Sequence, residues 1–130
     1  MSRRIAVIDD DGVFLTMLHD LLREEGYEPH VFPAGMAAYA RIRACTPHAI
    51  VVDIPRERAD VGWEILRRVR RDPALGAIPV IVCAADGEAW EEHTAVLRRD
   101  AYAVLPKPFD LGDLLALLTQ VTSPASAVSV

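Results

Sequence analysis

Short apolar runs alternate along the chain with stretches in which apolar residues recur every three or four positions. The runs predict strands at 5–8, 29–32, 49–52, 79–84 and 103–105. The periodic stretches predict helices at 35–44, 62–71 and 88–99, one from Phe14 to the residues before Gly26, and a last one capped by Asp110. Pro29 cannot donate to a strand ladder, so its strand is expected at an edge of the sheet.

Regular alternation of strand and helix predicts an α/β domain, in which helices cover both faces of a parallel sheet. The runs at 5–8 and 49–52 are apolar at every position, as strands buried on both faces require. The stretch 54–61 is charged and is expected to be a loop. Sheets of this kind bind ligands at the carboxyl ends of their strands, so the residues at those ends indicate the function.

Composition limits the range of functions. The chain has 130 residues, of which 52% are hydrophobic and 25% charged, and this predicts one globular domain. We expect that domain at 1–122, followed by a disordered tail or linker stub at 123–130. A net charge of −5 argues against direct binding of nucleic acid. No run resembles a signal peptide or a membrane span, so we expect no membrane contact and a cytoplasmic location, with Cys83 as a buried thiol.

Charged residues follow three of the predicted strands. Asp9 and Asp10 come after the first strand, Asp53 after the third and Lys107 after the fifth. In a parallel sheet these positions meet at one edge, where crowded carboxylates would repel unless a cation lay between them. Oxygen ligands favour Mg²⁺, and a lysine beside Mg²⁺ suits phosphoryl oxygens. A single aspartate there would be read as a helix cap, but capping does not explain the combination.

Three segments carry a resemblance to a known family. They are Ile5–Asp11, Pro47–Asp53 and Leu105–Phe109. Together they resemble the response-regulator receiver domain of two-component signalling, in the right order and over about residues 3 to 122. The resemblance implies a flavodoxin-like fold, in which a five-stranded parallel sheet has the order 2-1-3-4-5 and helices on both faces.

The resemblance also implies roles for individual residues. Asp53 would accept a phosphoryl group from a histidine kinase or a phosphotransfer protein, so the chain would be a phosphoprotein of a phosphorelay. Asp9, Asp10, Asp53 and the backbone carbonyl of Pro55 would bind Mg²⁺, and Lys107 would pair with a phosphoryl oxygen. Any activity of its own would be limited to self-phosphotransfer and autodephosphorylation.

Two positions depart from the family pattern. Ala84 stands where the family usually has Thr or Ser, and Val104 stands where it usually has an aromatic residue. Tyr102 shares a strand face with Val104 and is a weak substitute. In the family, the hydroxyl and aromatic residues at these two positions report phosphorylation to a distant face. Without them, we expect weakened or altered coupling to the face formed by the predicted helix 88–99, the strand 103–105 and the last helix. A homodimer or an output partner would use that face.

Three other interpretations remain open at this point. The chain could be a degenerate receiver that acts as an interaction module without phosphorylation. A flavodoxin-like cofactor binder is disfavoured because Asp9, Asp10 and Asp11 would repel a phosphate. A phosphatase of the haloacid-dehalogenase type needs its nucleophile on the first strand in an Asp-x-Asp arrangement, which the segment from Asp9 to Val13 matches poorly.

Overall fold

Five parallel strands form one sheet at the centre of the molecule. The computed structural model describes residues 2–35, 37–54, 59–85, 103–107 and 109–122. The strands are β1 (Arg4–Ile8), β2 (Glu28–Phe32), β3 (Ala49–Ile54), β4 (Val80–Ala85) and β5 (Ala103–Lys107). Their order is β2-β1-β3-β4-β5, which confirms the predicted fold class. The predicted helix at 88–99 and the tail at 123–130 lie outside the described residues.

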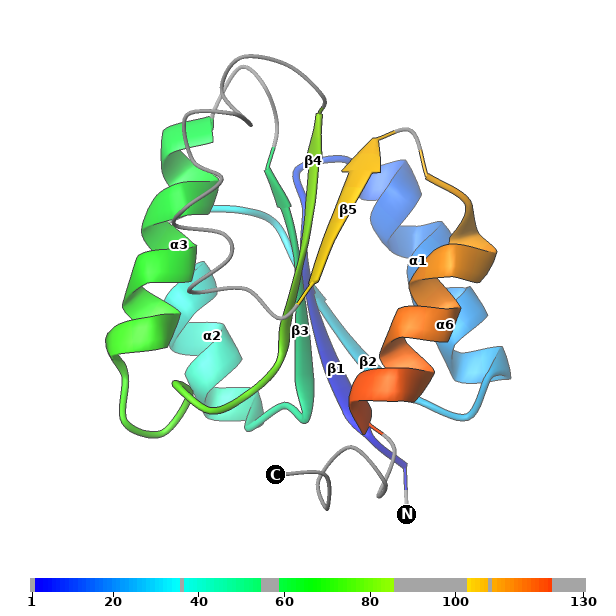
Figure 1. Ribbon diagram of the computed structural model, residues 1–130, viewed down its shortest axis with the longest axis horizontal. Helices are drawn as coiled ribbons and strands as arrows, with labels where there is room; N and C mark the ends of the chain where they lie inside the picture. The colour runs from blue at the N-terminus through cyan, green and yellow to red at the C-terminus, as the bar shows by residue number, and fades with distance from the viewer. Residues whose placement is uncertain (1, 36, 55–58, 86–102, 108, 123–130) are drawn as a thin grey trace.

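Helices cover both faces of this sheet. The described helices are α1 (Gly12–Glu24), α2 (Ala38–Cys45), α3 (Ala59–Arg71) and α6 (Leu111–Thr122). Figure 1 shows α2 and α3 on one face of the sheet, and α1 and α6 on the other. None of the described helices is long and apolar enough to cross a membrane.

Alternate residues of each strand enter two separate cores. Ile8 and Val52 pack with α2 and α3, whereas Val7 and Val51 pack with α1 and α6. All four side chains are at most 2% exposed. Burial on both faces explains why these strands are apolar at every position.

The edges of the sheet fall on the strands that contain proline. β2, with Pro29, is one edge, as predicted, and β5, with Pro106, is the other. Pro106 lies opposite Ala84 in the register of β4 and β5. An edge strand tolerates a proline because only one of its sides is paired. β5 thereby extends to Lys107, two residues beyond the predicted strand.

Two helices begin at residues other than those predicted. α3 begins at Ala59, inside the stretch expected to be a loop, and Ile54 belongs to β3. An early start adds a turn before Trp63, which is buried against the sheet, and puts Asp60 in the first turn, where the helix dipole favours a carboxylate. α2 begins at Ala38 rather than at residue 35, because Gly35 has a φ of +158°, which no α-helical residue adopts.

The ends of α1 and α6 agree with the sequence. Asp110 Oδ1 accepts a hydrogen bond from the Gly112 amide at 2.8 Å and caps α6. α1 ends before Gly26, whose φ of +89° is a left-handed conformation that glycine adopts without strain. The Tyr27 amide then donates to the Leu22 carbonyl at 2.9 Å and closes the helix end.

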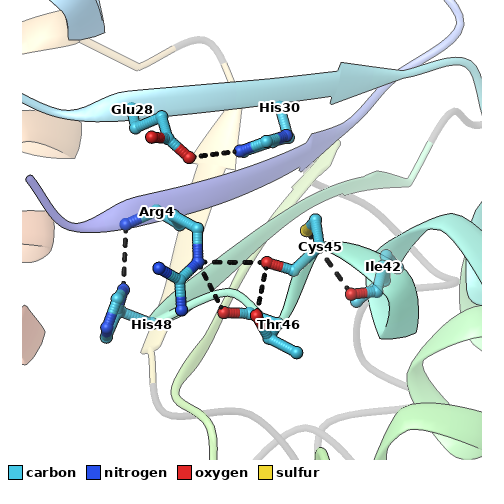
Figure 2. Close-up of polar contacts among 7 residues, drawn as sticks. All are labelled: Arg4, Glu28, His30, Ile42, Cys45, Thr46 and His48. Atoms are coloured by element: carbon cyan, nitrogen blue, oxygen red, sulfur yellow. Dashed lines mark hydrogen bonds and ion pairs between the residues drawn. The ribbon is translucent and has the colours of Figure 1, made fainter.

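Arg4 joins the start of β1 to the turn between α2 and β3, as Figure 2 shows. Its Nε donates to the carbonyls of Cys45 at 3.1 Å and Thr46 at 2.9 Å. Its backbone amide donates to Nδ1 of His48 at 2.9 Å, and the His48 amide donates to the Arg4 carbonyl. The contact fixes the amino-terminal edge of the sheet, opposite the edge where the acidic residues lie.

Candidate functional site

Two buried carboxyl groups stand at the carboxyl edge of the sheet. Ile8 of β1 pairs with Val52 of β3, so Asp9 and Asp53 occupy the next position on neighbouring strands. Such strands lie about 4.8 Å apart. Both aspartates are 5% exposed. The backbone therefore brings together two of the acidic residues that the sequence singled out.

The three aspartates after β1 differ in their contacts. Asp9 Oδ1 accepts a hydrogen bond from the Asp11 amide at 3.1 Å. Asp11 is the N-cap of α1, and its Oδ1 accepts from the amides of Val13 at 3.0 Å and Phe14 at 3.2 Å. Asp11 therefore has a structural role, as a helix cap beside the acidic pair.

Asp10 points toward the neighbouring loop. Its Oδ1 accepts a hydrogen bond from the Ala34 amide at 3.2 Å, and the Asp9 amide donates to the Phe32 carbonyl at 3.2 Å. These contacts tie the loop after β1 to the loop after β2. The sequence offers no signal for the Asp10 contact, because its donor is a backbone amide and does not depend on the side chain of residue 34.

Both positions that depart from the family pattern carry packed aliphatic side chains. Ala84 is 5% exposed and belongs to the core beneath α2 and α3. Val104 is partly buried and packs against the same core. Neither side chain has a hydrogen-bond donor. A phosphoryl group on Asp53 would find no hydroxyl at position 84 with which to bond.

Lys107 ends β5 at the same edge. Its Cα lies opposite that of Ala85, the last residue of β4. The backbone thus puts residue 107 at the edge where β1 and β3 deliver Asp9 and Asp53. Pro55 and Tyr102 lie outside the described residues.

The donor chemistry at this edge fits a hard cation. Asp9, Asp10 and Asp53 offer only oxygen atoms, and Mg²⁺ binds one or two carboxylates while keeping several waters. In the part of the chain that the structure describes, no three His, Cys, Asp or Glu side chains are grouped so as to hold a metal ion. A Mg²⁺ ion here would therefore draw on one or two of these carboxylates together with water.

Comparison with known proteins identifies the family. The response regulator receiver domain family matches residues 5–119. Among curated proteins, the response regulator MprA of Mycobacterium tuberculosis is 35% identical over 130 residues, which cover 98% of this chain and 55% of MprA. MprA of Mycobacterium ulcerans is 35% identical over 116 residues, or 89% of this chain and 48% of that protein. The chain spans about half the length of these relatives.

Solved structures agree with this result. A response regulator protein from Burkholderia multivorans has a TM-score of 0.72 and 28% identity, over 95% of this chain and 98% of that one. The chemotaxis response regulator CheY4 of Vibrio cholerae has a TM-score of 0.77 over 93% of this chain and 99% of that one. Its identity is 23%, so it supports the fold alone. With the family match over most of its length and the same fold, this chain belongs to the response regulator receiver domain family.

Proposed function

We propose that the chain is a phosphoacceptor receiver, in which Asp53 accepts a phosphoryl group from a histidine kinase or a phosphotransfer protein. The observation that carries this proposal is the position of Asp53. It is the last residue but one of the central strand β3, next to the strand that Asp9 follows, and Asp9 and Asp53 are each 5% exposed. Membership of the receiver family supplies the reaction class.

The transfer itself demands little of the protein. A carboxylate oxygen of Asp53 attacks the phosphorus atom, the bond from phosphorus to the donor's nitrogen breaks, and an acyl phosphate forms. A carboxylate is a weak nucleophile, so the rate depends on positioning and on offsetting negative charge. β3 holds Asp53 between β1 and β4, where its backbone lies opposite Cys83. Lys107, whose backbone ends β5 at the same edge, would pair with a phosphoryl oxygen.

Mg²⁺ is the cofactor that these residues would hold. The ligands would be drawn from Asp10, Asp53 and the backbone carbonyl of Pro55, with Asp9 bound directly or through water. When bound, the ion supplies positive charge that offsets the carboxylates and the oxygens of the incoming phosphoryl group. Asp9 contributes from a buried position, and Asp10 from an exposed one next to Ala34.

Weak coupling between Asp53 and the rest of the domain is part of the proposal. A ligand shifts a conformational equilibrium only through contacts that differ between the two states. A methyl group at Ala84 makes no hydrogen bond to a phosphoryl oxygen, and Val104 is too small to take the place of an aromatic ring. The outward face of β5 and α6, used by an output partner or a second copy, should therefore respond less to phosphorylation than in receivers with a hydroxyl at position 84.

The same two residues favour a second candidate function. With packed aliphatic side chains at 84 and 104, the domain would act as an interaction module whose binding does not depend on phosphorylation. For either function, the proposed domain is 1–122 and the proposed location is the cytoplasm. The proposed partners are proteins, and neither nucleic acid nor a membrane is bound directly. Flavodoxin-type and phosphatase functions find no support in the receiver family match.

A phosphodonor assay distinguishes the two functions. The chain is incubated with acetyl phosphate and Mg²⁺, and intact mass and ¹⁵N NMR spectra are recorded, with Asp53→Asn as the control. We expect one added phosphoryl group that requires Asp53, with small shifts in β5 and α6 that grow in Ala84→Thr. Absence of phosphorylation would favour the interaction module. Large shifts with Ala84 in place would contradict the weak coupling.

A further inference from the structure

A pocket lined by three arginines lies between α2 and the carboxyl end of α3. Its volume is about 330 Å³, and its lining residues are Tyr39, Arg43, Arg68, Arg71, Asp72 and Pro73. In a parallel α/β fold the helices run antiparallel to the strands, so the end of α3 points toward the sheet edge opposite Asp53 (Figure 1). The pocket is therefore separate from the phosphorylation edge.

The buried Asp72 contacts several of the residues that line the pocket. Its side chain is 2% exposed and accepts hydrogen bonds from the Tyr39 hydroxyl and from the Ala74 amide, the latter at 2.8 Å. Arg43 Nε lies 3.1 Å from Asp72 Oδ2. The Tyr39 hydroxyl, the Ala74 amide and Arg43 keep the pKa of Asp72 below its ordinary value, so the carboxylate stays charged. Asp72 thus holds Tyr39 and Arg43 in place without facing the solvent.

The arginines carry more positive charge than Asp72 offsets. The guanidinium of Arg68 lies over the ring of Tyr39, 4.3 Å from its centroid, which positions the guanidinium although the residue as a whole remains exposed. Arg43 is 60% exposed at its side chain, and Arg71 is exposed. Within the described residues, neither Arg68 nor Arg71 forms an ion pair with a carboxylate. Three guanidinium groups thus face one carboxylate, an excess of two positive charges.

Positive charge extends beyond the pocket along both helices. Arg41 lies over the ring of Phe32, and Arg67 pairs with Glu64. In 38–45 and 64–72 there are six arginines and two acidic residues, a net charge of +4. Since the whole chain carries −5, the remainder carries −9. The arginine-rich segments of α2 and α3 thus contrast in charge with the rest of the chain, whose net charge is negative.

The chemistry of the surface selects the kind of ligand. A guanidinium binds carboxylates and phosphates through paired hydrogen bonds. A long polyanion such as DNA would run beyond the patch onto surface whose net charge is negative, and would be repelled there. A membrane site would need apolar side chains near the arginines, yet the large exposed apolar residues of the described chain, Val13 and Met17, lie on α1. A short acidic segment would stay within the patch.

We propose that this surface binds an acidic segment of a partner protein, with Asp or Glu carboxylates against Arg43, Arg68 and Arg71. Tyr39 and Asp72 act as positioning residues, because they fix Arg68 and Arg43. Binding depends on two arginines whose removal breaks no ion pair within the described structure.

The test measures binding of a fluorescein-labelled hexaglutamate peptide to the full chain at 50 mM salt, by anisotropy, with ¹⁵N NMR mapping. We expect shifts at Tyr39, Arg43 and Arg71, and at least tenfold weaker binding at 200 mM salt or in the double variant Arg68→Gln and Arg71→Gln. The double variant Arg3→Gln and Arg23→Gln, which removes two exposed arginines outside this surface, is the matched charge control and should bind within twofold of the unchanged chain. The double variant Arg68→Lys and Arg71→Lys keeps the charge and should bind with intermediate affinity.

Several outcomes would overturn the proposal. One is equal weakening by the control pair Arg3→Gln and Arg23→Gln, which would mean that binding follows net charge alone. A second is that inorganic phosphate or a 12-base-pair DNA binds as tightly as the peptide. A third is that a second copy of the chain binds at the same residues in place of the peptide. Unfolding curves of each variant show whether it is folded, so that a loss of binding is not mistaken for a loss of folded protein. If the double glutamine variant does not fold, the affinity of the double lysine variant and the NMR map of the unchanged chain test the proposal instead.

Discussion

Neighbouring residues of one type have different environments at the end of β1. Asp9 is buried, Asp10 is exposed and bonds to the Ala34 amide, and Asp11 caps α1. A carboxylate has the same chemistry in all three positions, so burial and the nearest backbone amides decide which one caps a helix and which ones remain for a cation. Position in the tertiary structure, more than residue type, assigns each role.

His48 shows the same dependence on environment and predicts a pH effect. Burial, followed by Arg4 and Arg3, lowers the pKa of His48 below its ordinary value of 6.5. Its Nδ1 accepts the Arg4 amide, which a protonated Nδ1 cannot do. The unfolded chain therefore binds the proton more tightly than the folded one. His48 stabilises the fold above pH 6.5, and this contribution is lost as the pH falls through the lower pKa of the folded state.

Replacing the ring by an amide isolates this effect. In His48→Asn the Asn oxygen can accept the same amide but does not titrate. We expect urea unfolding between pH 7 and 5 to show a smaller loss of stability in His48→Asn than in the unchanged chain, with near-equal stability at pH 7. His19→Asn, at a partly exposed helix position beside Asp20, is the control. Identical pH slopes in the unchanged chain and His48→Asn would contradict the assignment.

At the scale of elements, the caps were the most predictable features. Asp110 and Gly26 stand at helix ends as the sequence indicates, because capping uses bonds between residues two to five positions apart. The first residues of helices that have no capping side chain were predicted less well. α2 begins three residues late, after the non-helical Gly35, and α3 begins three residues early, which adds a turn before the buried Trp63.

The cap of α1 supports a prediction on stability. Asp11→Ala removes the acceptor of the Val13 and Phe14 amides, so we expect a loss of about 1 kcal/mol in the free energy of unfolding. Asp11→Asn keeps an accepting oxygen and should lose only a few tenths of that value. Urea unfolding at pH 7 measures both. Equal losses would mean that the charge of Asp11 at the helix start matters more than its hydrogen bonds.

At the scale of the whole molecule, the proposed Mg²⁺ site would couple ion binding to folding. Only the folded chain brings β1 and β3 together, so an ion held there stabilises the fold by mass action. At a Mg²⁺ concentration ten times its Kd, the expected gain is about 1.4 kcal/mol. Thermal unfolding with and without Mg²⁺ measures it. The gain should vanish in the double variant Asp9→Asn and Asp53→Asn and persist in Asp20→Asn, which alters an exposed carboxylate on α1. A gain that survives the first pair would mean that the ion binds elsewhere.

The sequence by itself determined the order of strands and helices, the apolar core positions and the acidic residues at the sheet edge. These are local properties: each strand is recognised by its own apolar run, and the residue after a strand belongs to its carboxyl end wherever the strand lies. For the same reason Asp9 and Asp53 could be chosen as neighbours, and Lys107 assigned to the same edge, once a parallel sheet was expected.

The tertiary structure alone decided the contacts between segments distant in the chain. Asp10 meets the amide of Ala34, and Asp72 meets Tyr39 and Arg43 from another helix. A backbone amide is common to nearly every residue, and an exposed arginine has the same sequence pattern whether or not it lines a pocket. Such contacts depend on how helices and loops pack across 24 or more residues of chain, and a local pattern carries no record of that packing.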